Sequence, residues 1–239
     1  IFSGGFVGVD IFFVISGYLI TTIIIRELNN KTFSLKSFYE RRARRILPAL
    51  IFLILISTII SFIFLTRSEL ASYFKSVNAT LLFYSNFYFW ETTPYFGSEA
   101  DLEPLLHTWS LSIEEQFYII FPITLILIYK FFRKYLILFF IFSFVSSLLL
   151  CQIVALKTGG TLNFYFTFSR AWELALGAIC AYLIIYKNLS LSSISKNLLS
   201  SSGLALIVLS IFSFSRSTLY PSFYTLIPTL GTALIILFA

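Results

Sequence analysis

The chain has 239 residues and a formal net charge of +6, and 58% of its residues are hydrophobic while 12% are charged. Soluble domains average roughly 45–50% apolar and about 25% charged residues, so this composition indicates an integral membrane protein. With few Pro and Gly and no charge-rich block, it excludes disordered, collagen-like and soluble nucleic-acid-binding classes. Cys151 and Cys180 lie inside apolar runs, so we expect neither a disulfide framework nor a metal site. Because the chain begins at Ile1, contains no Met and ends in an apolar run at Ala239, we expect residues 1–239 to be a single membrane domain, incomplete at both ends.

Apolar runs approaching the roughly 20 residues that a bilayer requires recur along the whole chain. They predict an all-α, polytopic membrane protein with about seven transmembrane helices. The predicted spans are Phe6–Ile25, Ala49–Leu65, Ile113–Tyr129, Tyr135–Leu156, Ala171–Tyr186, Leu199–Phe214 and, as a short seventh, Phe223–Ala239.

The basic residues predict an orientation. The loops after the first, third and fifth spans hold seven, three and two of the 17 Lys and Arg residues. The positive-inside rule therefore places the segment Arg41–Arg45 in the cytoplasm and the side of His107 outside the cell. The net positive charge follows from this topology, so we do not expect a nucleic-acid partner.

The longest connection, residues 66–112, is expected on the outer side. Its stretch Ala79–Trp90 is rich in aromatic residues. We expect that stretch to form a helix lying in or dipping into the outer membrane interface.

Ionisable groups inside a bilayer are costly, so those in or at the ends of apolar spans are candidates for function. The first, third and fifth spans each carry such groups near the predicted outer end, which indicates one polar site at that face. The candidates are Asp10, Glu114, Glu115, Arg170, Glu173 and the only histidine, His107.

Each candidate also has a purely structural interpretation. Ser112 and Glu115 have the spacing of a helix capping box. Arg170 and Glu173 are three residues apart and could form an ion pair within one helix. Asp10 suits the first turn of a helix because of the helix dipole, and a single histidine beside a tryptophan is often only a hydrogen-bonded interface residue.

The densest charge in the chain is a basic run of four arginines within residues 41–45. It either anchors the topology and contacts anionic lipid head groups, or it forms a clamp for the phosphates of a nucleotide or diphosphate. Gly4 and Gly8 have a G-x-x-x-G spacing, which favours close helix packing over a phosphate loop. The basic run consists of Arg41, Arg42, Arg44 and Arg45.

Four ordered motifs resemble the membrane-bound acyltransferase 3 family. They are GFVGVDIFFVISGYLI at 5–20, FYERRARRILP at 38–48, LHTWSLSIEEQFY at 106–118 and RAWELALG at 170–177. The resemblance implies a bundle of about ten membrane helices. It also implies an enzyme of the inner membrane that moves an acyl group, commonly acetyl, from cytoplasmic acyl-CoA to hydroxyls of envelope glycans such as lipopolysaccharide O-antigen or peptidoglycan.

The resemblance also implies roles for residues of this chain. The four arginines match a basic segment that helps to hold the acyl-CoA donor, and no cofactor is bound tightly. The principal catalytic histidine of the family lies on a span that would precede Ile1. The other matched site residues are Asp10, His107, Glu114, Glu115, Gln116, Arg170 and Glu173.

Two other classes of protein fit parts of the pattern. A transporter or flippase would also use intramembrane carboxylates, although such proteins usually show inverted repeats and binding groups at the membrane midplane, and we see neither. A membrane scaffold would explain the spans but would leave Asp10, Glu173 and His107 without a role.

Overall fold

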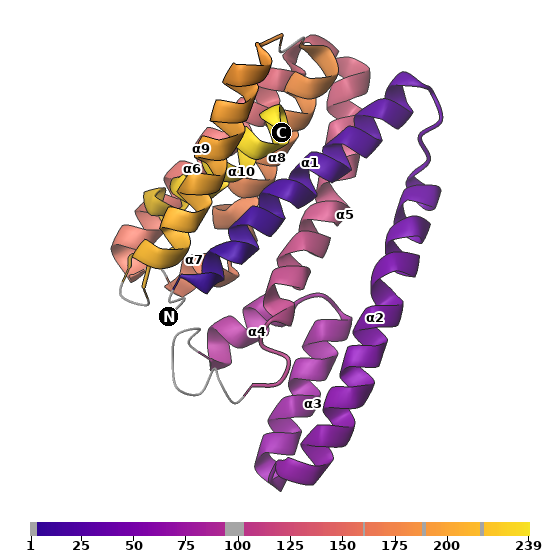
Figure 1. Cartoon of the computed structure of the whole chain (residues 1–239). Helices are drawn as coiled ribbons and strands as arrows, with labels where there is room; N and C mark the ends of the chain where they lie inside the picture. The colour runs from indigo at the N-terminus through magenta and orange to yellow at the C-terminus, as the bar shows by residue number, and fades with distance from the viewer. Residues whose placement is uncertain (1–3, 94–102, 160, 188–189, 216–217) are drawn as a thin grey trace. The chain divides into compact units, whose positions relative to one another are not determined.

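The computed structural model describes residues 4–93, 103–159, 161–187, 190–215 and 218–239, and its regular elements there are all helical (Figure 1). This confirms the predicted all-α class. Contacts divide the chain into two compact units, Ile1–Arg26 with Ile123–Ala239, and Glu27–Pro122. We call them the first and the second unit, and each is described by itself.

Six helices in the described part of the chain are long and apolar enough to cross a membrane, which confirms the first six predicted spans. The seventh prediction corresponds to a shorter apolar helix, Phe223–Phe238. The six are Gly5–Asn29, Leu35–Phe64, Thr108–Phe131, Arg133–Thr158, Thr167–Tyr186 and Ser193–Ser213.

The second unit begins with the end of α1 (Gly8–Asn29) and contains α2 (Leu35–Phe64). Helix α2 starts well before the predicted span, because the Ser34 side chain accepts a hydrogen bond from the Ser37 amide and caps the helix. Pro48 lies inside α2 and does not end it. The basic run at 41–45, which was expected in a loop, is therefore helical. Its backbone is continuous with the apolar part of α2.

Two helices, α3 (Arg67–Leu81) and α4 (Ser85–Thr92), follow. The expectation of one helix over Ala79–Trp90 is wrong, since Phe83 between them has a φ of 53°, which a continuing right-handed helix does not permit. Residues 94–102 of the predicted outer loop lie outside the described residues.

Helix α5 (Thr108–Phe131) starts before Ser112, so Ser112 does not cap it. The predicted capping box of Ser112 and Glu115 is therefore wrong. The Ser112 hydroxyl instead accepts a hydrogen bond of 3.2 Å from the Ser85 amide. A capping box does occur at the start of α3, where the Thr66 hydroxyl and the Glu69 carboxylate satisfy each other's backbone amides.

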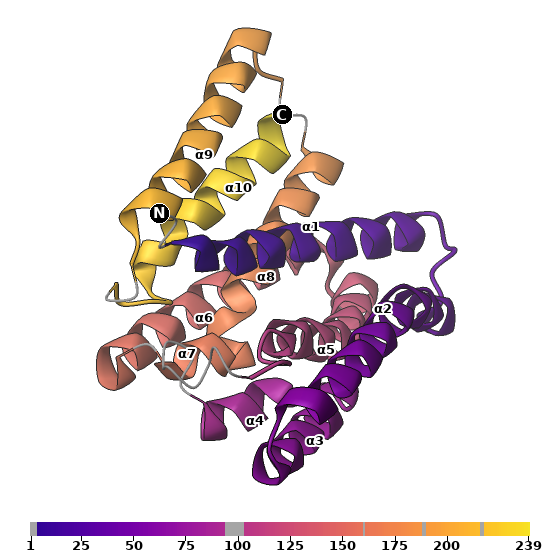
Figure 2. The ribbon, with the colours of Figure 1, turned by 60° about the horizontal axis from the view of Figure 1, so that its bottom comes forward.

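The first unit contains η1 (Gly5–Val7), most of α1, and the helices after α5. In it α6 packs on α8, α9 on α10, and α8 on α10 (Figures 1 and 2). The bounds are η3 (Arg133–Tyr135), α6 (Leu136–Thr158), α7 (Thr161–Tyr165), α8 (Thr167–Tyr186), α9 (Ser193–Ser213), η4 (Phe223–Thr225) and α10 (Leu226–Phe238).

Glycines bring the backbones of this unit together. A Cβ on Gly177 would lie 2.0 Å from the Val14 carbonyl oxygen, and one on Gly17 would lie 2.0 Å from the Leu174 carbonyl oxygen. Helices α1 and α8 therefore cross in direct backbone contact. Of the two glycines in the G-x-x-x-G spacing, Gly4 packs closely, with a Cβ position 2.6 Å from the Ser210 oxygen, whereas Gly8 faces open space.

Candidate functional site

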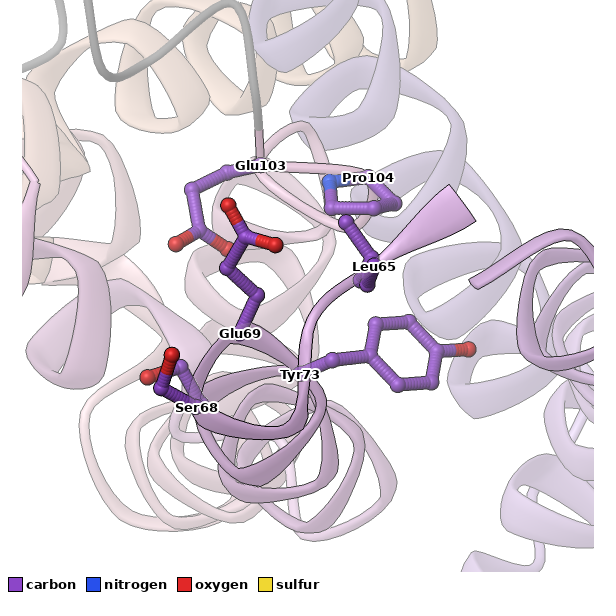
Figure 3. Close-up of a pocket in the computed structure, with 7 residues that line it drawn as sticks. Leu65, Ser68, Glu69, Tyr73, Glu103 and Pro104 are labelled. Carbon is purple, nitrogen blue, oxygen red and sulfur yellow. The ribbon is translucent and has the colours of Figure 1, made fainter. Parts of the chain in front are cut away.

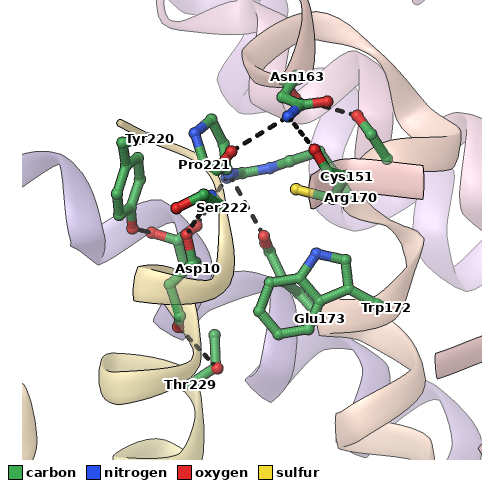
Figure 4. A network of polar contacts seen from close by, with 12 residues as sticks. Asp10, Cys151, Asn163, Arg170, Trp172, Glu173, Tyr220, Pro221, Ser222 and Thr229 are labelled. Atoms are coloured by element: carbon green, nitrogen blue, oxygen red, sulfur yellow. Dashed lines mark hydrogen bonds and ion pairs between the residues drawn. The ribbon is translucent and has the colours of Figure 1, made fainter. Parts of the chain in front are cut away.

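Three ionisable side chains of the first unit meet in a fully buried cluster (Figure 4). The Nη1 atom of Arg170 lies 2.9 Å from Oδ1 of Asp10 and 3.3 Å from Oε1 of Glu173. All three side chains are 0% exposed. Asp10 comes from the first turn of α1, and the other two lie three residues apart on α8. The predicted ion pair of Arg170 with Glu173 is confirmed, and Asp10 forms a second ion pair with the same guanidinium.

Tyr220, which no sequence pattern singles out, joins this cluster. The Tyr220 hydroxyl donates a hydrogen bond to Oδ2 of Asp10, and Tyr220 lies between α9 and α10. Burial, and next the Asp10 carboxylate, raise the pKa of Tyr220 well above its usual value. Tyr220 therefore stays protonated and acts as the donor.

Further polar contacts support the same region of the first unit. The Ser147 hydroxyl accepts a hydrogen bond of 2.9 Å from the Trp172 amide, which lies between the two charged residues of α8. The Asn163 side chain donates to the carbonyl oxygens of Cys151 and Pro221 at 2.7 and 3.1 Å (Figure 4). These contacts tie α6, α7 and the segment after α9 to the buried cluster.

A second charged cluster lies in the second unit, between α2 and α5. The Nη2 atom of Arg42 lies 3.4 Å from Oε1 of Glu115 and 3.7 Å from Oε1 of Glu114. The same guanidinium stacks over the Tyr118 ring at 3.7 Å from its centroid, and the Tyr118 hydroxyl donates to Glu114. Aromatic stacking and two carboxylates thus fix the Arg42 side chain in one place.

The four arginines of the basic run do not act together, because the helix places Arg42 and Arg44 on other faces than Arg41 and Arg45, which are four residues apart. Arg41 pairs with Glu27 at 2.7 Å, and Arg44 pairs with Glu40 at 2.8 Å. Among the described residues, no carboxylate forms an ion pair with Arg45. Arg45 is therefore the arginine of the run most available to an anion.

Arg45 and His107 line the same cavity, which has a volume of about 480 Å³. The rest of its wall is mainly aliphatic and comes from α2 and from the segment between Pro104 and Leu111. A cavity of this size with one cation and one imidazole in an apolar wall has the character of a small-molecule site.

These contacts bring the basic run close to His107. Arg42 contacts Glu115, and Arg45 shares a cavity with His107. The two helices run antiparallel, as shown by the Tyr39 hydroxyl, which donates to the Ile119 carbonyl oxygen at 3.0 Å. Hydropathy does not detect the carboxylates that accompany Arg42.

A smaller cavity of about 340 Å³ lies where α2 turns into α3 (Figure 3). Leu65, Ser68, Glu69, Tyr73, Glu103 and Pro104 line it. The Thr66 backbone amide and hydroxyl hold the pKa of Glu69 below its usual value. Glu69 is therefore ionised near neutral pH and remains engaged in capping α3.

Comparison with known proteins identifies the chain. A family model described as an acyltransferase domain matches residues 1–239. The chain belongs to the acyltransferase 3 family. It is 40% identical to an uncharacterised protein of Haemophilus influenzae, over 95% of this chain and 96% of that protein.

Relatives with a named activity occur in Staphylococcus aureus. The chain is 39% identical to the O-acetyltransferase OatA over 76% of this chain, and 37% identical to a putative O-acetyltransferase over the same share. In both cases the match spans 30% of the relative's length. No solved structure is significantly similar.

The residues of the acyltransferase 3 motif at 106–118 contact two different groups of helices. Thr108, Ser112 and Gln116, spaced four residues apart, face α3 and α4. The Gln116 side chain donates to the Phe83 carbonyl oxygen at 2.9 Å and so holds the positive-φ turn between those helices. On α5, Glu114, Glu115 and Tyr118 instead contact Arg42 of α2.

The candidate residues of the apolar spans that form ion pairs belong to two clusters, one within each unit. Asp10, Arg170 and Glu173 meet in the first unit, and Arg42 meets Glu114 and Glu115 in the second. His107 is exposed and belongs to the cavity of the second unit.

Proposed function

We propose that the protein is a membrane O-acyltransferase that moves an acyl group, acetyl foremost, from acyl-CoA to a hydroxyl of a cell-envelope glycan. Family membership and the O-acetyltransferase relatives support the reaction class. We also propose that it acts in the plasma membrane with a donor from the cytoplasm.

One observation carries this proposal. The cavity of the second unit combines an arginine without a carboxylate partner among the described residues, an exposed imidazole and an apolar wall. An acyl-CoA has matching parts, since its phosphates are anions, its thioester is a polar reacting group and its acyl chain is apolar.

The phosphates would contact Arg45 and, one helical turn earlier, Arg41. Guanidinium groups bind phosphate oxygens through strong, charge-assisted hydrogen bonds. The ion pair of Arg41 with Glu27 is partly exposed, and exposed pairs contribute little stability, so a phosphate can replace the carboxylate at low cost. The thioester then lies farther along α2, in the cavity beside His107.

The reaction needs one base and one proton transfer. The acceptor oxygen forms a bond to the acyl carbon as the carbon–sulfur bond breaks. The His107 imidazole takes the proton of the hydroxyl and returns it to the departing thiolate, which leaves as CoA thiol. Glu114 and Glu115 hold Arg42 in place beside this site, so we assign them a positioning role.

The buried cluster of the first unit has a different task. Asp10, Arg170 and Glu173 are fully buried, so we assign them to joining α1 and α8 rather than to contact with substrate. Because they join two helices that cross in backbone contact, their effect on catalysis would be through the geometry of the first unit.

The activity is tested first in cells. Envelope polysaccharide from strains with the intact gene deleted and restored is compared by mass spectrometry for base-labile acyl esters. Esters lost on deletion and regained on restoration support the proposal, and they identify the acceptor. Unchanged esters would refute transfer to an envelope glycan.

The donor site is tested with Arg45→Ala in the full-length protein in membranes. Hydrogen bonds to charged groups contribute about 1.5–3 kcal/mol. Since 1.4 kcal/mol is a factor of ten, KM for acetyl-CoA should rise roughly 10- to 100-fold, while KM for the acceptor stays unchanged.

Lys36→Ala is the matched control, because it also removes a positive charge from α2, one turn before the basic run and away from the cavity. Its KM values should equal those of the wild type. An equal rise in both KM values for Arg45→Ala, or the same rise for the control, would contradict the donor site.

A further inference from the structure

The cavity of the second unit is cationic at one end and apolar at the other, and one row of α2 side chains sets this order. Arg45, Ala49 and Leu53 are spaced four residues apart and all line it. Residues with this spacing lie on one face of a helix, and the row spans about 12 Å at 1.5 Å per residue. The cationic end is at Arg45, and the far end at Leu53 is apolar.

The facing wall carries its one ionisable group, His107, between two leucines. In the antiparallel register set by Arg42 beside Glu115, the α2 residues after Arg45 come opposite Leu111, then His107, then Leu105. Leu50 and Leu105 are almost completely buried and form the apolar side of the cavity. A ligand lying along α2 therefore passes from a cation, past an imidazole, to an aliphatic end.

Ala49 has the smallest side chain of this lining and stands in the middle of the row. Its neighbours along α2 that also line the cavity are Ile46, Leu50 and Leu53, all branched aliphatic residues. A larger side chain at position 49 would therefore extend into the space between Arg45 and Leu53.

We infer that Ala49 is a specificity-determining residue that sets which acyl chains the donor can carry. This inference rests on the proposed function, since it takes the ligand of the cavity to be an acyl-CoA. With the phosphates beyond the arginine end of the row, toward Arg41, the pantetheine arm extends along α2 and brings the acyl group to the apolar end, at Ala49 and Leu53. The side chain at 49 then limits its bulk.

Donor competition in the full-length protein tests this inference. The rates with acetyl-CoA and butyryl-CoA are measured for the wild type and for Ala49→Leu. One or two methylenes in an apolar pocket change discrimination by about tenfold or more, so the ratio of butyryl to acetyl transfer should fall at least about tenfold in Ala49→Leu.

Ala43→Leu is the matched control. It is the same substitution in the same helix, at an exposed position that does not line the cavity. Its ratio should equal that of the wild type. Should Ala49→Leu abolish transfer from both donors, Ala49→Gly provides the second measurement, because it enlarges the cavity and should raise the ratio.

The outcomes are distinct. A ratio that falls in Ala49→Leu or rises in Ala49→Gly, with Ala43→Leu unchanged, supports the inference. A ratio that is the same in wild type and in the active position-49 variants overturns it and leaves the proposed function standing. If the wild type transfers no acyl group from either donor, the proposed function fails and the inference fails with it.

Discussion

Removal of Arg170 should destabilise the protein strongly. Its guanidinium lies 2.9 Å from Asp10 and 3.3 Å from Glu173, and all three side chains are 0% exposed. Arg170→Ala would leave two buried carboxylates without their cation. Breaking a buried ion pair in this way costs about 3–5 kcal/mol.

The expected loss can be converted into a melting temperature. For a chain of this size 1 kcal/mol shifts Tm by about 2–4 °C, so Arg170→Ala should lower Tm by roughly 6–20 °C. The full-length protein is heated in detergent, and the fraction that remains monodisperse is followed by size-exclusion chromatography. Arg67→Ala, an exposed arginine at the start of α3, should shift Tm by less than about 2 °C.

A combined variant separates the charge effect from the loss of packing. Asp10→Asn, Arg170→Met and Glu173→Gln together remove all three charges and keep similar volumes. Replacing a whole buried ionic cluster is often neutral for stability, so this variant should recover at least half of the Tm lost in Arg170→Ala. A triple variant that melts as low as the single one would refute the reasoning, as would an Arg170→Ala protein that melts like the wild type.

Two further predictions concern packing and capping. Gly177→Ala should reduce the yield of folded protein in membranes, since its Cβ would lie 2.0 Å from the Val14 oxygen, whereas Gly8→Ala adds its Cβ in open space and should leave the yield unchanged; equal yields would contradict the close crossing. Glu69 has a lowered pKa in the folded state, so its capping contribution is present above the usual Glu value of about 4.3 and is lost as the pH falls through the lower folded value. Glu69→Gln should therefore have a lower Tm than the wild type at pH 7 but not in strong acid, and a difference that is constant with pH would show that the charge has no role.

The spans could be predicted because hydropathy acts locally. Each apolar run reports on its own helix, and helix type follows from the absence of water in the bilayer. The starts of α2 and α5 were missed because caps and polar turns extend a helix beyond its apolar part. Ser34 caps α2 fifteen residues before Ala49, where the predicted span begins.

The partners of the charged residues could not be predicted in the same way. Glu115 meets Arg42 across 73 positions, and Tyr220 meets Asp10 across 210, and nothing in the local pattern points across such separations. One signal was present in the sequence but was not used. The spacing of Thr108, Ser112 and Gln116 is a polar stripe on one helix face, and it indicates a neighbouring polar backbone such as the turn at Phe83.

The first turns of α5 contact α3 and α4 on one side and α2 on another, and these contacts limit which substitutions the segment accepts. From Thr108 to Tyr118 no residue is exposed, and hydrogen bonds to α3 and α4 alternate with contacts to α2. A substitution at any of these eleven positions therefore affects a side chain that is at least partly buried. New specificities would arise more readily from the row of α2 side chains along the cavity, since Ala49 and Leu53 are exposed aliphatic residues.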